Sequence, residues 1–381
     1  MAKLFRITTV PVSVEKLLGK QLTFMNQYFD VTAISADKEY LERVGKELDV
    51  RTHSIEMTRK ITPMQDLKSL WKMYVYFKKE KPEIVHSHTP KAGLIGMLAA
   101  KLAGVRVRLH TVAGLPLMET SGLKRKVLIQ VEKFTYACAT NVYPNSKGLY
   151  NFILKEKLGN TDKLEVIGNG STNGIDVNYF DPALFSGQAK YRLREELNIT
   201  SDDFVYIFVG RLVKDKGINE LISAFKNIQS QNLKKVKLLL VGPLEQDLDP
   251  LSPEVLDEIE KNPDIISVGF QKDVRQYFAI SNALVFPSYR EGFPNVVLQA
   301  LAMGLPAMVS DINGCNEIII NLENGIVFPP KNADSVQEAM ILCMRPELYN
   351  KLQADARGSV MKYKQEIIWE LLKKNYERFL I

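Results

Sequence analysis

Residues 204–217 read FVYIFVGRLVKDKG, an apolar, β-forming run that ends at a glycine and continues into a basic segment. A continuous apolar run bounded by a turn signal is typical of a strand buried in a parallel sheet. Gly210 allows the backbone to turn tightly where the run ends. The stretch therefore predicts a buried strand whose carboxyl end carries a loop with two cations, Arg211 and Lys216.

Strand-like and helix-like segments alternate on both sides of this stretch. In the second half, further strands are expected at residues 236–241, 265–268, 283–286 and 307–310, with a helix at 219–229. In the first half, strands are expected at residues 4–10, 31–35, 83–86, 106–111 and 141–144, with helices at 15–28, 66–79 and 93–103. This alternation predicts two doubly wound parallel sheets, each covered by helices on both faces.

The polar stretch 181–203 separates the halves, so we place a domain boundary near residue 180, giving domains 1–180 and 181–381. The terminal helix, about 362–381, either belongs to the second domain or packs back on the first. Doubly wound sheets bind ligands outside the carboxyl ends of their strands. Both sets of strand ends are expected to face a single cleft.

Composition excludes several classes of protein. The three cysteines, Cys138, Cys315 and Cys343, form no CxxC pair, which argues against a structural zinc site and fits a reducing cytoplasm. No signal-peptide profile and no apolar run of about 20 residues is found, so we expect a cytoplasmic protein. No GxGxxG follows the first strand and no GxxxxGK[ST] occurs, which disfavours dinucleotide and P-loop enzymes.

The net charge of +6 includes basic clusters at residues 68–81 and 124–126. Such clusters are either a solvated face or a contact with anionic lipid headgroups or a lipid-linked phosphate. Peripheral attachment to the inner face of the plasma membrane therefore stays open. Nucleic acid is not expected as a partner, because no aromatic-and-basic recognition motif accompanies the charge.

A second chemical segment, FPSYREGFPNVVLQA at residues 286–300, combines a strand end, a turn and a helix that starts near Asn295. The free N–H groups at a helix start form an anion site. The guanidinium of Arg211 suits bidentate phosphate contact, and the ammonium of Lys216 acts as a point charge. Together they would offset the negative charge that develops on a departing nucleotide.

The combination of GRL…KDKG, PS..EGFPNVVLQALAMGLP and Gly314…Glu317 resembles the C-terminal half of the retaining GT-B glycosyltransferases of family 4, and in particular bacterial surface-polysaccharide enzymes. Residues 173–176 (NGID) resemble the turn between that family's domains. His86-Ser87-His88 and His110-Thr111 resemble strand ends of its first domain. The resemblance covers nearly the whole chain. It implies an α/β GT-B fold, with two Rossmann-like domains facing across a cleft, an N-terminal acceptor-binding one and a C-terminal nucleotide-sugar-binding one.

The resemblance also implies roles for individual residues. Arg211 and Lys216 would hold the nucleotide diphosphate, Glu291 would accept hydrogen bonds from the donor sugar, and His110 would lie near the reacting carbon. The remaining positions assigned to nucleotide-sugar binding are Gly210, Gly292, Phe293, Asn295, Val296, Leu298 and Gln299. The chain departs from the family at Gln299, where a glutamate usually takes the ribose hydroxyls, and at the first loop, where Gly19 comes late.

The expected reaction moves a sugar, with retention, from a UDP- or GDP-linked donor to a hydroxyl of a glycan or polyprenyl-diphosphate-linked acceptor. No Asp-x-Asp motif marks a donor site, so no metal or other cofactor is expected. His86 and His88 are expected on opposite faces of a strand and not as a metal pair. Two alternatives remain: a sugar-nucleotide epimerase of the same fold, and a non-catalytic sugar-nucleotide-binding protein.

Overall fold

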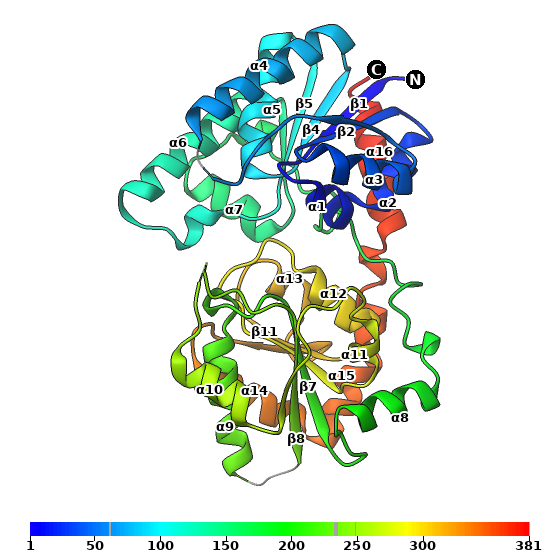
Figure 1. Cartoon of the computed structure of the whole chain (residues 1–381), viewed down its shortest axis with the longest axis vertical. Helices are drawn as coiled ribbons and strands as arrows, with labels where there is room; N and C mark the ends of the chain where they lie inside the picture. The colour runs from blue at the N-terminus through cyan, green and yellow to red at the C-terminus, as the bar shows by residue number, and fades with distance from the viewer. Residues whose placement is uncertain (61, 232–234, 248, 381) are drawn as a thin grey trace. The chain divides into compact units, whose positions relative to one another are not determined.

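The computed structural model describes residues 1–60, 62–231, 235–247 and 249–380. The chain forms two compact units (Figure 1). Unit 1 comprises Met1–Gly174 together with Gln365–Ile381, and unit 2 comprises Ile175–Lys364. The chain first passes between them at Gly174–Ile175, near the boundary that the sequence predicts.

Within the described ranges, the sheet of unit 1 has six strands in the order β3-β2-β1-β4-β5-β6. Every neighbouring pair is parallel. The strands are β1 (Lys3–Ile7), β2 (Asp30–Ser35), β3 (Arg51–Ser54), β4 (Ile84–Ser87), β5 (Val107–Val112) and β6 (Asn141–Pro144). The order reverses between β1 and β4, which is the switch point where doubly wound sheets bind ligands.

Helices cover both faces of this sheet. The longer ones are α2 (Lys20–Asn26), α3 (Lys38–Leu48), α4 (Pro63–Glu80), α5 (Pro90–Ala103), α6 (Gly122–Cys138), α7 (Lys147–Lys155) and α16 (Gln365–Arg378), with short turns at α1 (Pro11–Ser13), η1 (Val14–Leu18), η2 (Pro116–Glu119) and η3 (Thr161–Lys163). Alternate residues of β1 serve different cores: Phe5 and Ile7 pack with α4 and α5, whereas Leu4 packs with α2, α3 and α16. This alternation is what a strand buried on both faces requires.

Helix α16 belongs to unit 1. Of the two placements that the sequence left open, the structure therefore has the one in which the terminal helix packs back on the first domain. The Tyr376 hydroxyl is 2.6 Å from Nδ1 of His86, and Nε1 of Trp369 donates to Oδ1 of Asn173 at 2.6 Å. Trp369, Leu372 and Tyr376 are buried in one core with β1 and β2.

The sheet of unit 2, within the described residues, also has six parallel strands, in the order β12-β11-β10-β7-β8-β9. They are β7 (Phe204–Val209), β8 (Val236–Val241), β9 (Ile265–Ser267), β10 (Ala283–Phe286), β11 (Ala307–Ser310) and β12 (Gly325–Phe328). Counted from its own first strand, unit 2 repeats the topology of unit 1. Its switch point lies between β7 and β10.

The helices of unit 2 are α8 (Gly187–Glu196), α9 (Ile218–Ser230), α10 (Pro253–Lys261), α11 (Arg275–Ala279), α12 (Asn295–Ala302), α13 (Cys315–Ile318), α14 (Ala333–Cys343) and α15 (Pro346–Ser359), with turns at η4 (Pro182–Leu184), η5 (Lys214–Lys216) and η6 (Met361–Tyr363). They enclose one continuous apolar core. The prediction of two Rossmann-like parallel sheets is confirmed.

Two strands and one helix differ from the sequence prediction, and several helices, among them α3, α6, α14 and α15, were not predicted. β3 was not predicted because its residues, RTHS, are polar and partly exposed, and β12 was not predicted because it is four residues long and opens with Gly325. The single helix predicted over residues 15–28 is broken into η1 and α2 by Gly19, whose φ is 46°. In the described part of the chain, no helix combines the length and apolarity needed to cross a membrane.

Candidate functional site

The predicted donor-site residues gather at the switch point of unit 2. Gly210 and Arg211 follow β7 directly, and Pro287 and Ser288 follow β10, which pairs with β7 in parallel register. Loops from neighbouring strands therefore leave the same edge of the sheet, where such folds bind ligands.

Lys216 and Glu291 form an ion pair at this edge. Both side chains are mostly buried, with 18% and 17% of their surface exposed. The Ser288 hydroxyl donates to the same Glu291 oxygen, Oε1, at 2.8 Å. Lys216, which the sequence assigned to the diphosphate, and Glu291, which it assigned to the donor sugar, are thus in direct contact. Ser288 holds the Glu291 carboxylate in position by donating to the oxygen that pairs with Lys216.

Two glycines bring backbone segments into close contact here. Gly217 has a φ of 71°, and a Cβ on it would lie 2.1 Å from the carbonyl oxygen of Pro287. Gly314 has a φ of 73°, and a Cβ there would lie 2.3 Å from the carbonyl oxygen of Gly292. Both positions require glycine, because a side chain would need an unfavourable φ and would displace the loop that carries Glu291.

Helix α12 begins just after this loop. Its N-cap residue, Pro294, makes no side-chain capping hydrogen bond, so the first turn presents backbone N–H groups that suit an anion. Asn295 is exposed and Val296 and Gln299 are partly buried, whereas Leu298 and Phe293 lie in the core. Leu298 and Phe293 can therefore contribute only backbone groups to a ligand.

Arg211 lies apart from the Lys216–Glu291 pair. Its Nη1 is 3.0 Å from Oε2 of Glu245, and 44% of its side chain is exposed. Because the Arg211 side chain is on the surface, it can rotate toward a diphosphate, but in the structure it pairs with the carboxylate of Glu245.

Sequence reasoning did not assign a role to the residues that support Lys216. Nη2 of Arg290 is 3.1 Å from Oδ2 of Asp215, and the backbone N–H of Tyr289 donates to the carbonyl of Asp215 at 2.9 Å. The Tyr289 hydroxyl donates to Glu220 at 2.6 Å. These contacts tie the turn after β7 to the loop after β10. Their only sequence signal is that the residues flank the two segments already singled out.

His110, on β5 of unit 1, is 97% shielded from solvent. Its Nδ1 is 2.9 Å from the Ser87 hydroxyl, and its ring lies against Gly93 of α5, where a Cβ would lie 2.4 Å from Cε1. Burial lowers the pKa of His110 to about 4. A neutral, closely packed imidazole is therefore available at neutral pH, with Nδ1 committed to Ser87.

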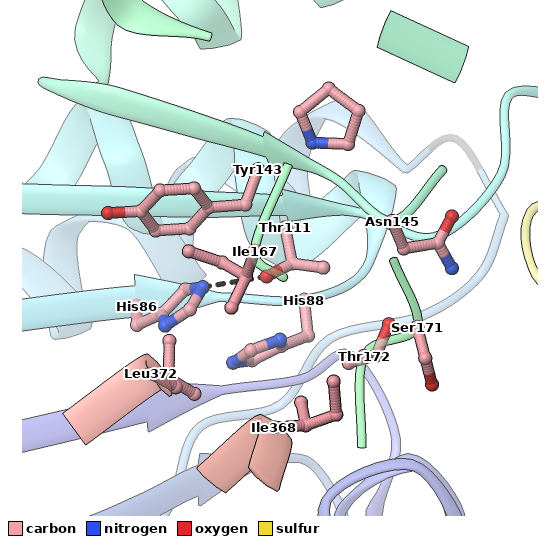
Figure 2. A pocket seen from close by; sticks show the side chains of 11 residues that line it. His86, His88, Thr111, Tyr143, Asn145, Ile167, Ser171, Thr172, Ile368 and Leu372 are labelled. Atoms are coloured by element: carbon pink, nitrogen blue, oxygen red, sulfur yellow. Dashed lines mark hydrogen bonds between the residues drawn. The ribbon is translucent and has the colours of Figure 1, made fainter. Parts of the chain in front are cut away.

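His86, on β4, and His88, which directly follows β4, lie on the same face of the sheet, and the prediction of opposite faces is wrong. Residues two apart on a strand share a face, and their ring centroids are 4.1 Å apart. Figure 2 shows the two rings side by side in a small pocket at the carboxyl ends of β4 to β6, with Ile368 and Leu372 of α16 below them. No group of three or more His, Cys, Asp or Glu that could hold a metal ion is found in the part of the chain that the structure describes.

Comparisons with known proteins place this geometry in a family. The family model described as "Glycosyl transferase 4-like domain" matches residues 24–170, and "Glycosyl transferases group 1" matches residues 190–358. The Staphylococcus aureus capsular polysaccharide biosynthesis glycosyltransferase CapM is 35% identical over 380 residues, which cover 99% of this chain and 97% of the relative. The chain is a family 4 glycosyltransferase.

Other relatives of this glycosyltransferase point the same way. An Escherichia coli protein, UDP-Gal:alpha-D-GlcNAc-diphosphoundecaprenol alpha-1,3-galactosyltransferase, is 28% identical over 341 residues, or 88% of this chain and 85% of the relative. The structure of Anabaena HepE in complex with UDP and glucose superposes with a TM-score of 0.82 at 18% identity, covering 99% of this chain and all of that one. The GT-B fold is thereby confirmed, as is the predicted assignment to the surface-polysaccharide glycosyltransferases.

Proposed function

We propose that this family 4 glycosyltransferase moves a sugar, with retention of configuration, from a nucleoside diphosphate sugar to a hydroxyl of a lipid-linked acceptor in surface-polysaccharide synthesis. The observation that carries the proposal is the Lys216–Glu291 ion pair beside the start of α12, at the switch point of unit 2. The cation of Lys216 and the N–H groups at the start of α12 suit a diphosphate, and the carboxylate of Glu291 can accept hydrogen bonds from sugar hydroxyls.

UDP-sugars are the first donors to test. The E. coli relative is named for a UDP-galactose donor, and HepE has been crystallised with UDP and glucose. In our proposal the diphosphate takes Lys216 and the α12 N–H groups, Arg211 turns from Glu245 to join them, and Gln299 takes the ribose. Glu291 then accepts hydrogen bonds from the sugar hydroxyls.

The reaction breaks the bond between the anomeric carbon and the diphosphate oxygen and forms a bond from that carbon to the acceptor oxygen on the same face. The leaving phosphate takes the acceptor's proton, so no carboxylate nucleophile is required. Lys216 and the α12 dipole stabilise the negative charge that grows on the leaving group. His110, in this proposal, lies near the reacting carbon.

The acceptor is proposed to be a polyprenyl diphosphate carrying a sugar. Two relatives, from E. coli and Campylobacter jejuni, are named for diphosphoundecaprenol-linked acceptors. Such an acceptor is anchored in a membrane, so the enzyme must reach a membrane surface. Unit 1 offers a surface suited to that contact.

Helix α4 exposes an apolar stripe, Met64, Leu67, Trp71 and Val75, at helical spacing. Lysines 68, 72, 78 and 79 are exposed on the same helix. Helix α6 repeats the pattern with exposed Leu123, Val127 and Phe134 and with Lys124 and Lys126. Both helices pack on α5 (Figure 1). Apolar and aromatic residues mixed with lysine are the composition of helices that lie in an anionic membrane interface.

The first test is a thermal-shift panel with UDP, GDP and their sugar conjugates, followed by incubation of the stabilising donor with and without a sugar-diphosphate-lipid. A ligand at 100 times its Kd should stabilise the fold by about 2.7 kcal/mol. Product that requires the acceptor, with an anomeric configuration by NMR that matches the donor's, supports the proposal. Conversion of the donor without acceptor identifies an epimerase, and binding without turnover identifies a non-catalytic sugar-nucleotide-binding protein.

A further inference from the structure

Unit 1 holds a fully buried arginine without an acidic partner. Arg6, in the middle of β1, has no exposed surface. Its Nε donates to Nε2 of His88 at 2.9 Å, and its Nη2 donates to Oε1 of Gln21 at 2.6 Å. Nη1 has no hydrogen-bond partner, and among the residues that the structure describes no carboxylate pairs with the guanidinium. Buried charges are ordinarily paired, because an isolated ion in a protein interior is costly.

The hydrogen bond from Arg6 determines the tautomer of His88. Arginine can only donate, so Nε2 of His88 must accept and carry no proton. Burial lowers the pKa of His88 well below its ordinary value, so the ring is neutral and its single proton is on Nδ1. This Nδ1–H is buried and has no partner.

The neighbouring His86 shows that the free donor is specific to His88. Both ring nitrogens of His86 have partners inside the protein: Tyr376 at 2.6 Å and Thr111 at 2.7 Å. The two rings lie side by side, tilted by 36° with centroids 4.1 Å apart, and are about equally buried. Of these two rings, His88 alone has an N–H without a partner.

That pocket is small, and its lining is partly polar and partly apolar. His88 lines it together with Thr111, Asn145, Ser171 and Thr172 (Figure 2). Oγ1 of Thr172 and Oδ1 of Asn145 are also buried without partners. The cavity has a volume of about 20 Å³, which is enough for about one water molecule. It is therefore large enough for a single oxygen atom of a larger group.

The position of the pocket is that of a ligand site. His88 follows β4 directly, and its backbone N–H donates to the carbonyl of Ile7 on β1 at 3.0 Å. It therefore lies at the β1–β4 switch point, where doubly wound sheets receive ligands. A buried N–H donor backed by a cation that has no carboxylate partner favours an anion as ligand.

We propose that this pocket is an anion subsite that takes one phosphoryl oxygen of the acceptor's diphosphate, with His88 Nδ1–H as the donor and Arg6 as the buried counter-charge. The naming of the acceptor rests on the proposed function, whereas the anion subsite itself does not. Arg6 acts through His88, and Gln21, which donates to the Thr172 carbonyl at 3.1 Å, links the guanidinium to the pocket wall.

The test is NMR of the full chain labelled with ¹⁵N-histidine, which has only four histidines, each with two ring-nitrogen signals, to assign. The free protein should show His88 neutral with its proton on Nδ1. Sodium phosphate, pyrophosphate or geranyl diphosphate, added at constant ionic strength, should shift the His88 Nδ1 signal. The signal of His53, on the far edge strand β3, should stay in place.

The other outcomes are equally decisive. No His88 shift at tens of millimolar pyrophosphate, or an equal shift with chloride, overturns the phosphoryl assignment and leaves a water site. A shift at lower concentration with UDP than with geranyl diphosphate assigns the site to the donor and overturns the acceptor assignment. Shifts in a protein that transfers no sugar keep the anion subsite while removing the proposed reaction.

A kinetic readout separates substrate contact from a structural role. His88→Leu removes the donor and should raise the KM for the lipid-linked acceptor at least tenfold, with the KM for the nucleotide sugar unchanged. His88→Gln keeps an acceptor for Arg6 and an N–H for the pocket, so it should recover most of the loss. An equal effect of both variants on both substrates would show that His88 only supports the fold.

Discussion

Lys216 and Glu291 are far apart in the sequence, yet their side chains form an ion pair that is more than four-fifths buried. The pair joins the turn after β7 to the loop after β10. In the proposed reaction, a diphosphate that binds Lys216 and a sugar that binds Glu291 would have to compete with this contact. The ion pair therefore keeps both side chains in position until a ligand takes the place of Glu291 beside Lys216 and of Lys216 beside Glu291.

Replacing Lys216 with alanine should lower kcat/KM by about 10²- to 10³-fold, the usual cost of losing one group that stabilises developing negative charge. The matched control is Lys226→Ala, which breaks the Lys226–Glu258 pair on the exposed side of α9. Steady-state kinetics of both variants decide the point. Comparable rates for Lys216→Ala and Lys226→Ala would remove Lys216 from the leaving-group role.

Gly314→Ala should impair donor binding while leaving most of the fold intact. The added methyl would lie 2.3 Å from the Gly292 carbonyl oxygen and push the Glu291 loop out of position. Gly304→Ala is the control, because its φ of 77° is equally unfavourable but nothing lies within 4 Å of the new Cβ. Donor Kd by calorimetry should rise for Gly314→Ala beyond any change in the control; equal Kd values would show that the loop contact is unimportant.

Gln299→Glu tests the position where the resemblance implies a glutamate in place of the glutamine of this chain. If Gln299 contacts the ribose, a carboxylate there should preserve or improve donor affinity, since it accepts hydrogen bonds more strongly than an amide does. Titration with the donor nucleoside diphosphate measures the effect. A collapse of binding would mean that the Gln299 N–H₂ group donates to the ligand or that the site excludes a further negative charge.

Trp71→Ser should weaken binding to anionic vesicles about tenfold, the loss expected for one large apolar side chain, and binding of the parent protein should weaken as salt is raised. Phe270→Ser is the control, because Phe270 of unit 2 is as exposed as Trp71, at 71% against 65%. Vesicle co-sedimentation gives the comparison. An equal loss for both variants would indicate general stickiness, and no loss for Trp71→Ser would exclude the α4 stripe from membrane contact.

Burial raises the pKa of Glu132, on α6, from 4.5 to about 7. The folded state thus keeps a proton that the unfolded chain releases between pH 4.5 and 7, so this group's contribution to the free energy of unfolding falls as pH rises through that window. Glu132→Gln should raise the melting temperature by several degrees at pH 8 and leave it unchanged near pH 4.5. Exposed Glu47 supplies the control, Glu47→Gln; a pH-independent gain for Glu132→Gln would point to packing instead.

Much of the fold could be predicted because buried parallel strands such as β7 are continuous apolar runs. The strands that were missed, β3 and β12, both lie at sheet edges. β3 is polar and partly exposed, so its sequence carries little hydrophobic signal, whereas β12 is apolar but only four residues long and opens with a glycine. Gly19 also shows that one residue's backbone angle can divide a helix whose side-chain pattern is continuous.

The sequence gives the motifs of the candidate site, but it does not indicate which of their side chains pair. The sequence singled out Lys216 and Glu291 separately, but nothing in their spacing indicates that they form an ion pair. Arg6 gave a signal that was not used: a charge within the apolar run LFRI of a buried strand. Its partners, Gln21 and His88, come from α2 and from the end of β4, and only the folded sheet brings them together.

Helix α16 has a consequence for how this enzyme is made. The ribosome releases residues 1–174, then the whole of unit 2, and only afterwards the helix that supplies Trp369, Leu372 and Tyr376 to the first core. Until then, the face of the first sheet carrying Leu4 and Val31 lacks part of its cover, and His86 lacks its tyrosine partner. Unit 2 is continuous and can fold first during synthesis, whereas unit 1 must wait for a segment made some two hundred residues later. A truncation at residue 174 would therefore yield an incomplete unit, and isolating it would require residues 365–381 to be joined back on.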